Sequence, residues 1–114
     1  MGWLAVKRGD LVVVVAPGDY GKPRPALVIQ SDAYNEAHES VVVCLLSSAL
    51  FDAPHFRLLV EPSPSNGLKR RSQIMIDKTT AIKREHFGDR IGALSKDDML
   101  RVNRTLALWL GLGE

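Results

Sequence analysis

The chain has 114 residues, of which 46% are hydrophobic and 25% charged, and its formal net charge is +2. These values are those of one small globular domain, residues 1–114, with a single modest core, and they exclude a disordered or fibrous chain. No apolar run is long enough to span a membrane, and the single cysteine, Cys44, excludes an internal disulfide, so a cytoplasmic location is expected.

The first half of the chain is predicted to form three strands. Residues 11–16 are mostly β-branched and precede a turn-rich loop, which predicts a strand and then an exposed connection. A second strand is expected over residues 26–30, and Pro25 could be its first residue because a strand tolerates proline there. The polar residues 31–40 have room for a short helical turn before a third strand over residues 41–46.

The second half begins with a fourth strand over residues 56–62. Residues 62–71, PSPSNGLKRR, combine two prolines, an Asn-Gly pair and consecutive cations, which predicts an exposed loop. A fifth strand is expected over residues 72–77, ending at Asp77, and the passage after it shows no regular pattern.

A helix closes the chain. Ser95 is its expected N-cap, with Asp98 in the capping-box position, and the helix should run to Leu110 before Gly111 stops it. Its apolar stripe consists of Met99, Val102, Leu106, Trp109 and Leu110. Short strands without crossover helices predict a mainly β protein with α: a small antiparallel barrel or strongly coiled sheet closed by this helix.

Familiar catalytic signatures are absent. The sequence has no phosphate-binding glycine loop, no HExxH, no CxxC and no nucleophile elbow. Its three histidines lie in separate polar segments, so no metal site is predicted. Among them His55 is the one best placed to carry a proton, because it lies in a loop between two core strands.

Polar residues stand where predicted strands meet loops. Arg24 lies between two prolines, which restrict its backbone, and precedes the second strand. Ser47 and Ser48 end the third strand, and Asp77 ends the fifth. In a small barrel these positions can converge on one rim. The alternative is that Arg24 is a surface cation, the serines satisfy turn backbone and Asp77 pairs with a lysine.

Five segments together resemble the MazF/PemK family of growth-inhibiting toxins. They are RGDLVVV, RPALVIQ, VVVCLLSS, SQIMIDK and the tail GDRIGALSKDDMLRVNRTLALWLGL, and the likeness spans about residues 6–112. The resemblance implies an SH3-like barrel that dimerises and cleaves single-stranded RNA sequence-selectively, without a metal or other cofactor. It also implies a cognate antitoxin that blocks the toxin with an acidic, partly disordered segment.

The resemblance also implies site residues. Arg24 matches the arginine of the family's Arg-Pro motif, and Ser47 best matches its catalytic hydroxyl, with Ser48 as the alternative. Asp77 matches an acidic residue of some members. The chain departs from the family at Pro23, which is an extra proline, and at Met75, where some relatives carry a second arginine.

RNA binding would use the basic third quarter of the chain, because residues 69–90 hold seven Lys or Arg against three acids. An aromatic ring to stack on a base and the second serine complete the set. The candidate substrate-binding residues are therefore Tyr20, Lys22, Ser48, Lys69, Arg70, Arg71 and Lys83. The KRR run could equally be a solvated loop.

The chemistry that the resemblance implies is attack of the ribose 2′-hydroxyl on phosphorus, which gives a 2′,3′-cyclic phosphate. Arg24 would stabilise the phosphorane oxygens, and Ser47 would add a neutral hydrogen bond. Asp77 or water is favoured as the base over a histidine or an arginine of lowered pKa. The alternatives to a nuclease are a non-enzymatic toxin that poisons DNA gyrase, as the related CcdB group does, and a binding module without toxicity.

Overall fold

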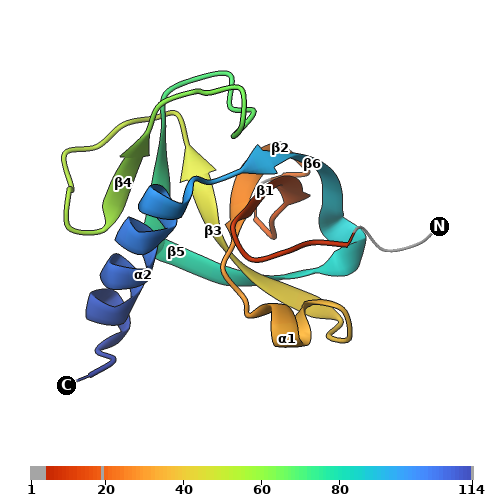
Figure 1. Cartoon of the computed structure of the whole chain (residues 1–114). Helices are drawn as coiled ribbons and strands as arrows, with labels where there is room; N and C mark the ends of the chain where they lie inside the picture. Colours follow the sequence, from red (N-terminus) through yellow and green to blue (C-terminus); the bar gives the residue numbers. More distant parts are fainter. Residues whose placement is uncertain (1–4, 19, 114) are drawn as a thin grey trace.

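A computed structural model describes residues 5–18 and 20–113, and this part of the chain folds into a six-stranded sheet with two α-helices (Figure 1). The elements in chain order are β1 (Asp10–Val15), β2 (Pro23–Val28), α1 (Asp32–Asn35), β3 (Ser40–Ser47), β4 (Arg57–Val60), β5 (Ser72–Lys83), the 3-10 turn η1 (Arg84–His86), β6 (Phe87–Ala93) and α2 (Lys96–Leu110). The short helical turn expected after the second strand is α1.

The sheet has the order β4-β5-β3-β2-β1-β6, and every ladder in it is antiparallel. The expectation of a mainly β, antiparallel fold with a C-terminal helix is therefore confirmed. No ladder joins the outer strands β4 and β6 within the described residues, so strand pairing does not close the barrel. The gap is spanned by the loop of residues 61–71, where the backbone N–H of Ala93 donates to the carbonyl of Ser65 at 3.0 Å.

Strand β2 begins earlier than expected, at Pro23, and β4 is shorter than expected, but two other elements differ more from the sequence prediction. Strand β5 continues to Lys83 instead of ending at Asp77, because its second half pairs with the start of β3 beyond a register shift between Cys44 and Leu46. Strand β6 occupies the passage that showed no regular pattern. Only one of its seven residues, Gly92, is buried, so no alternation of apolar and polar residues appears in the sequence. β1 holds β6 through a ladder and an Arg90–Asp10 ion pair of 3.0 Å.

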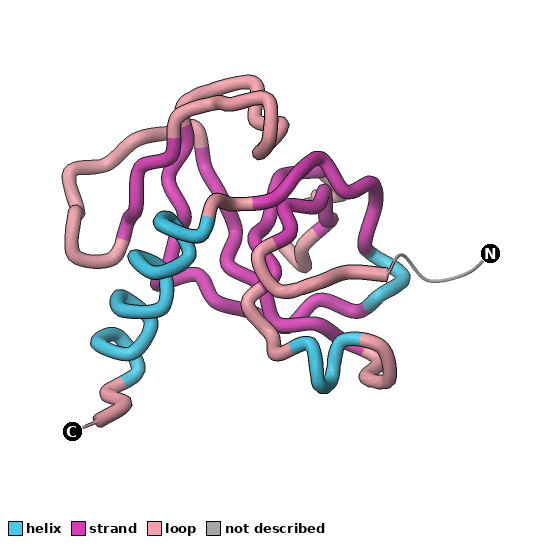
Figure 2. The backbone as a smooth tube through the Cα atoms, in the orientation of Figure 1, coloured by secondary structure: helices cyan, strands magenta, loops and turns pink. Residues whose placement is uncertain are grey.

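Helix α2 lies along β4 and β5 (Figures 1 and 2). Its ends are as expected: the Ser95 hydroxyl accepts from the Asp98 backbone N–H at 3.1 Å, and Gly111 takes a left-handed conformation with φ of 71°. Val102 and Leu106 are buried in the core, while Leu110 is exposed. Within the described part of the chain, no helix has both the length and the apolarity to cross a membrane.

Candidate functional site

The candidate site lies where β2 and β3 separate. These strands pair from Val28 opposite Val43 to Ala26 opposite Leu45, and the ladder then stops. Two further steps in the same register would set Arg24 opposite Ser47. Proline has no N–H to donate, so Pro23 and Pro25 favour an edge at this end of β2, which pairs there with β1 alone.

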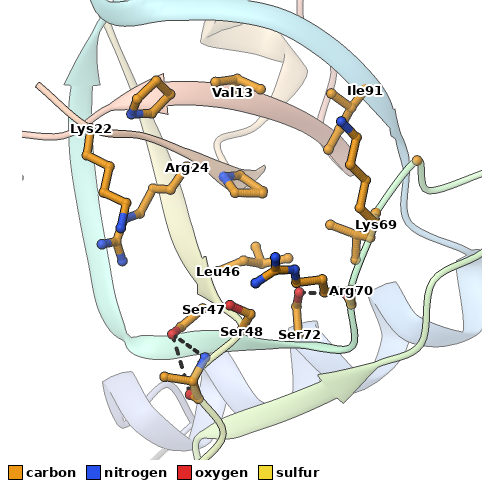
Figure 3. Close-up of a pocket in the computed structure, with 15 residues that line it drawn as sticks. Val13, Lys22, Arg24, Leu46, Ser47, Ser48, Lys69, Arg70, Ser72 and Ile91 are labelled. Atoms are coloured by element: carbon orange, nitrogen blue, oxygen red, sulfur yellow. Dashed lines mark hydrogen bonds between the residues drawn. The ribbon is translucent and has the colours of Figure 1, made fainter.

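A pocket of about 620 Å³ occupies this opening (Figure 3). Its walls come from β1, β2, the end of β3, the loop 61–71, the first residue of β5 and β6. Six of the candidate residues line it: Lys22, Arg24, Ser47, Ser48, Lys69 and Arg70. Of the four residues that could converge on one rim, Arg24, Ser47 and Ser48 line this pocket and Asp77 does not; Arg24 lies inside β2 and does not precede it.

The pocket is cationic. Lys22, Arg24, Lys69 and Arg70 approach it from two segments that are far apart in the sequence, and none of the described residues that line it is acidic or a histidine. In Figure 3, Lys22 and Arg24 extend together from one wall and Arg70 reaches in from the opposite side. Cations converging on a concave surface concentrate field lines there and favour an anionic ligand with several phosphates.

The two serines differ in their hydrogen bonds. The hydroxyl of Ser47 accepts from the backbone N–H of Ala49 at 3.0 Å and donates to the Ala49 carbonyl at 3.4 Å. This is the turn role that was the alternative prediction for the serines. The longer bond is the weaker one, so the Ser47 proton can turn to a ligand oxygen at small cost. Ser48 is exposed at the same rim.

Asp77 does not line the pocket. It lies within β5 and binds the guanidinium of Arg57 in a bidentate arrangement, with oxygen–nitrogen distances of 2.7 and 2.9 Å. The expected partner was a lysine, and the observed one is an arginine. These hydrogen bonds lower the pKa of Asp77 from its ordinary value of 3.8, which makes the carboxylate a weak base.

The Arg57–Asp77 pair should make the free energy of unfolding depend on pH in the acidic range. Because the pKa of Asp77 is lower in the folded state, the pair stabilises the fold above the unfolded pKa, and the contribution is lost as pH falls through the folded value. We expect the free energy of unfolding of the wild type, measured with urea, to fall more steeply below the ordinary value of 3.8 than that of Asp77→Asn. Asp98→Asn, which removes an exposed pair with Arg101, is the control. Parallel curves for wild type and Asp77→Asn would contradict this.

The other candidate residues lie outside the pocket. Tyr20 is fully exposed in the loop between β1 and β2, and Arg71 pairs with Glu61 at 2.9 Å. Lys83 is at the far end of β5, opposite Ser40. His55 is exposed in the loop between β3 and β4. Contacts of these residues with a long substrate stay predictions.

Among the described residues, no group of three His, Cys, Asp or Glu side chains has the arrangement of a metal site. Sequence reasoning missed two polar side chains near the site: Gln73, which is buried, and Arg57, which is mostly buried. An arginine inside the apolar strand FRLLV was the available signal for the first, because such a cation needs a buried acidic partner. For Gln73 the sequence held no signal, because its hydrogen-bond partner is the backbone of Phe51, which any residue type would provide.

Comparison with known proteins identifies the family of the chain. Residues 7–110 match the family model described as PemK-like, MazF-like toxin of type II toxin-antitoxin system. A curated protein of Mycolicibacterium smegmatis, named a probable endoribonuclease MazF, is 42% identical over 108 residues, covering 94% of this chain and 98% of its own.

Two solved structures share the fold. A mycobacterial endoribonuclease in complex with its cognate antitoxin superposes with a TM-score of 0.77 at 23% identity, over 96% of this chain and 98% of that one. The Mycobacterium tuberculosis toxin MazF-mt6 gives a TM-score of 0.79 at 18% identity, over 92% and 99%. The resemblance in sequence, the family match and the common fold lead to one conclusion: this chain belongs to the PemK-like, MazF-like family of type II toxins.

Proposed function

We propose that the protein is a sequence-selective endoribonuclease toxin that cleaves single-stranded RNA without a metal and so inhibits growth. The observation that carries the proposal is the cationic pocket that Arg24 of β2 and Ser47 of β3 line together, beyond the last pair of the β2–β3 ladder. The printed name of the 42% identical relative supports the reaction class, and family membership supports the toxin role.

The reaction needs a nucleophile that the substrate itself supplies. The ribose 2′-oxygen attacks the adjacent phosphorus, the bond from phosphorus to the 5′-oxygen breaks, and the products are a 2′,3′-cyclic phosphate and a free 5′-hydroxyl. The protein must hold the attacking oxygen in line, stabilise charge on the phosphorane oxygens and let one proton leave the 2′-hydroxyl while another reaches the 5′-oxygen.

Arg24 is assigned the stabilisation of the phosphorane. A guanidinium can donate to two phosphate oxygens at once and stays cationic throughout. Ladder pairing with β1 holds its backbone on one side, and the flanking Pro23 and Pro25 limit its φ and ψ. The donor is thus oriented before RNA binds, which reduces the reorganisation needed in the transition state.

Water is assigned the proton of the 2′-hydroxyl. Asp77, the other favoured base, is held by Arg57 outside the pocket, and no described lining residue is acidic or a histidine. Asp77 then has a structural role beside the site, where it holds Arg57. Solvent also supplies the proton that the 5′-oxygen receives. Lys22, Lys69 and Arg70 bind flanking phosphates.

Two protein partners complete the proposal. The antitoxin would place an acidic, partly disordered segment across the cationic pocket in the cytoplasm, competing with RNA for the same cations. A second copy of the chain would cover apolar side chains exposed on and after α2, which are Leu100, Leu108, Trp109, Leu110 and Leu112. Sedimentation equilibrium at micromolar concentration should give twice the 12.6 kDa monomer mass, and a monomer would remove this part of the proposal.

The nuclease proposal is tested with purified protein and a mixed RNA pool in excess EDTA. We expect cuts within one short sequence, with 2′,3′-cyclic phosphate and 5′-hydroxyl ends. A matched oligonucleotide with a single 2′-deoxyribose at the cleavage position should resist, because it lacks the nucleophile. Cleavage of that oligonucleotide, or no cleavage of any RNA, would overturn the proposal.

The two serines are separated by single substitutions. Ser47→Ala should lower the single-turnover cleavage rate about tenfold, the effect of one hydrogen bond worth roughly 1.4 kcal/mol in the transition state. Ser48→Ala, one residue away at the same rim, should have a smaller effect. The reverse order would transfer the catalytic assignment to Ser48.

A further inference from the structure

Gln73 is a buried polar residue directly beside the proposed site. It pairs with Ser47 across the β3–β5 ladder, and the residue is only 6% exposed. The side-chain amide bonds both backbone groups of Phe51: its oxygen accepts from the Phe51 N–H at 2.9 Å, and its nitrogen donates to the Phe51 carbonyl at 2.7 Å. One side chain thus satisfies both backbone groups of Phe51, as a neighbouring strand would do in a ladder.

Phe51 is held from a second direction as well. The guanidinium carbon of Arg57 lies 5.4 Å from the centroid of the Phe51 ring, in cation–π range. Asp77 fixes that guanidinium through the bidentate pair described above. The Phe51 carbonyl also accepts from the backbone N–H of Ala53 at 3.0 Å. Phe51 is therefore an anchored point in the loop between β3 and β4, four residues after Ser47.

The segment 47–51 needs such an anchor, because β3 has no β2 partner beyond Leu45. The backbone of Ser47 is supported by β5 on one side, Ser48 lies beyond that ladder, and both residues line the open pocket. A segment supported on one side can shift unless its far end is fixed. A shift of about 1 Å in a catalytic group can cost roughly a hundredfold in rate.

We propose that Gln73 is a positioning residue for the nuclease, clamping Phe51 so that the hydroxyls of segment 47–51 stay directed at the pocket that holds Arg24. The inference rests on the function proposed above. It also assigns a use to Asp77 and Arg57: they complete the clamp from the side of the Phe51 ring, and neither needs to touch RNA.

Hydrogen exchange tests the clamp without any RNA. Gln73→Ala should increase amide exchange in segment 48–53, first at Phe51, and leave α2 and the ladder between β1 and β2 unchanged. Gln30→Ala is the matched control, because its side chain also bonds backbone, at Val42 and Ser40, but at the far end of β3. Unchanged exchange at Phe51 in Gln73→Ala would overturn the clamp.

Single-turnover cleavage tests the positioning. Gln73→Ala should lower the rate constant about tenfold or more at saturating RNA, with the affinity for an uncleavable 2′-deoxy analogue within threefold and the reaction amplitude unchanged. A loss of folded protein would instead lower the amplitude. In protein that already carries alanine at Ser47 and Ser48, adding Gln73→Ala should change the rate less than threefold, because both changes act through the same hydroxyls.

Gln73→Glu provides a variant of the same size. At neutral pH its carboxylate can accept from the Phe51 N–H but cannot donate to the Phe51 carbonyl, so its rate should be several-fold below that of the wild type. Protonation restores the donor, and the ratio of variant to wild-type rate should rise as pH falls toward 5. Two results would overturn the positioning role. One is a ratio of Gln73→Glu to wild-type rate that does not change with pH. The other is a tenfold loss of rate on adding Gln73→Ala to protein that already carries alanine at Ser47 and Ser48. If the wild-type protein cleaves no RNA, the proposed nuclease function is wrong. The hydrogen-exchange experiment then still tests whether Gln73 holds Phe51.

Discussion

Replacing Arg24 with alanine is expected to lower kcat/KM for RNA cleavage by about 10²–10³-fold, the usual effect of removing one preorganised donor from a transition state. Arg24→Lys should recover only part of this loss, because an ammonium is a point charge and cannot form the two parallel bonds of a guanidinium. Cleavage of a defined RNA in EDTA measures the effect, and unfolding in urea shows that each variant is folded. Arg101→Ala, which removes an exposed cation outside this pocket, is the matched control and should retain full activity.

The same variant separates the two kinds of toxin. A nuclease that depends on Arg24 predicts that cells expressing Arg24→Ala grow normally while the folded protein accumulates. A toxin that poisons DNA gyrase through its C-terminal helix predicts growth arrest regardless of Arg24, and loss of toxicity on removal of residues 109–114. Growth arrest by Arg24→Ala, with no RNA cut in the cells, would therefore replace the first reading by the second.

Replacing Gly67 with alanine is expected to destabilise the protein by about 2–4 kcal/mol, because a positive φ and a backbone clash act together. Gly67 has φ of +69°, and a β-carbon on it would lie 1.9 Å from the carbonyl oxygen of Ile91 in β6. That neighbour is backbone, so the loop itself must move. The midpoint of thermal unfolding should fall by about 10 °C or more for a domain of this size.

Gly18→Ala is the control for this effect. Gly18 has φ of +86°, but no atom lies within 4 Å of a β-carbon built there, so it carries the conformational cost alone, about 1 kcal/mol. Equal losses in both variants would show that the contact between the loop and β6 contributes nothing. A surviving fraction of folded Gly67→Ala should also cleave RNA more weakly, because Lys69 and Arg70 follow Gly67 in the pocket wall.

The loop 61–71 therefore has two roles that its composition did not reveal. Its prolines, serines and cations predicted an exposed connection, and several of its residues are exposed. Asn66, however, is buried: its amide nitrogen bonds the Glu61 carbonyl at 2.9 Å, and its oxygen accepts from the backbone of Ser63 and Leu68 at 3.0 and 2.9 Å. The loop is thus an ordered strap that covers the gap between β4 and β6 and brings two cations to the pocket.

The sequence alone determined the parts of the fold that depend on local chemistry. Short apolar runs, several of them rich in β-branched residues, located the first five strands to within a few residues, and Ser95 and Gly111 located the ends of α2. Burial, capping and left-handed turns each leave such a short-range pattern. The Arg-Pro dipeptide pointed to Arg24 for the same reason, since proline restrains its neighbours directly. The polar residues where strands meet loops suggested that Arg24, Ser47, Ser48 and Asp77 could converge on one rim, and only the first three line the pocket.

Tertiary structure decided what depends on partners distant in the chain. Strand β6 exists because β1 offers it a ladder, and β5 runs past Asp77 because β3 does the same, so neither boundary left a local signal. Asp77 and Gln73 have roles set by Arg57 and by the backbone of Phe51, both about twenty residues away. A side chain carries its own chemistry, but whether it faces a pocket, an arginine or a loop carbonyl is fixed only when the sheet brings separate segments together.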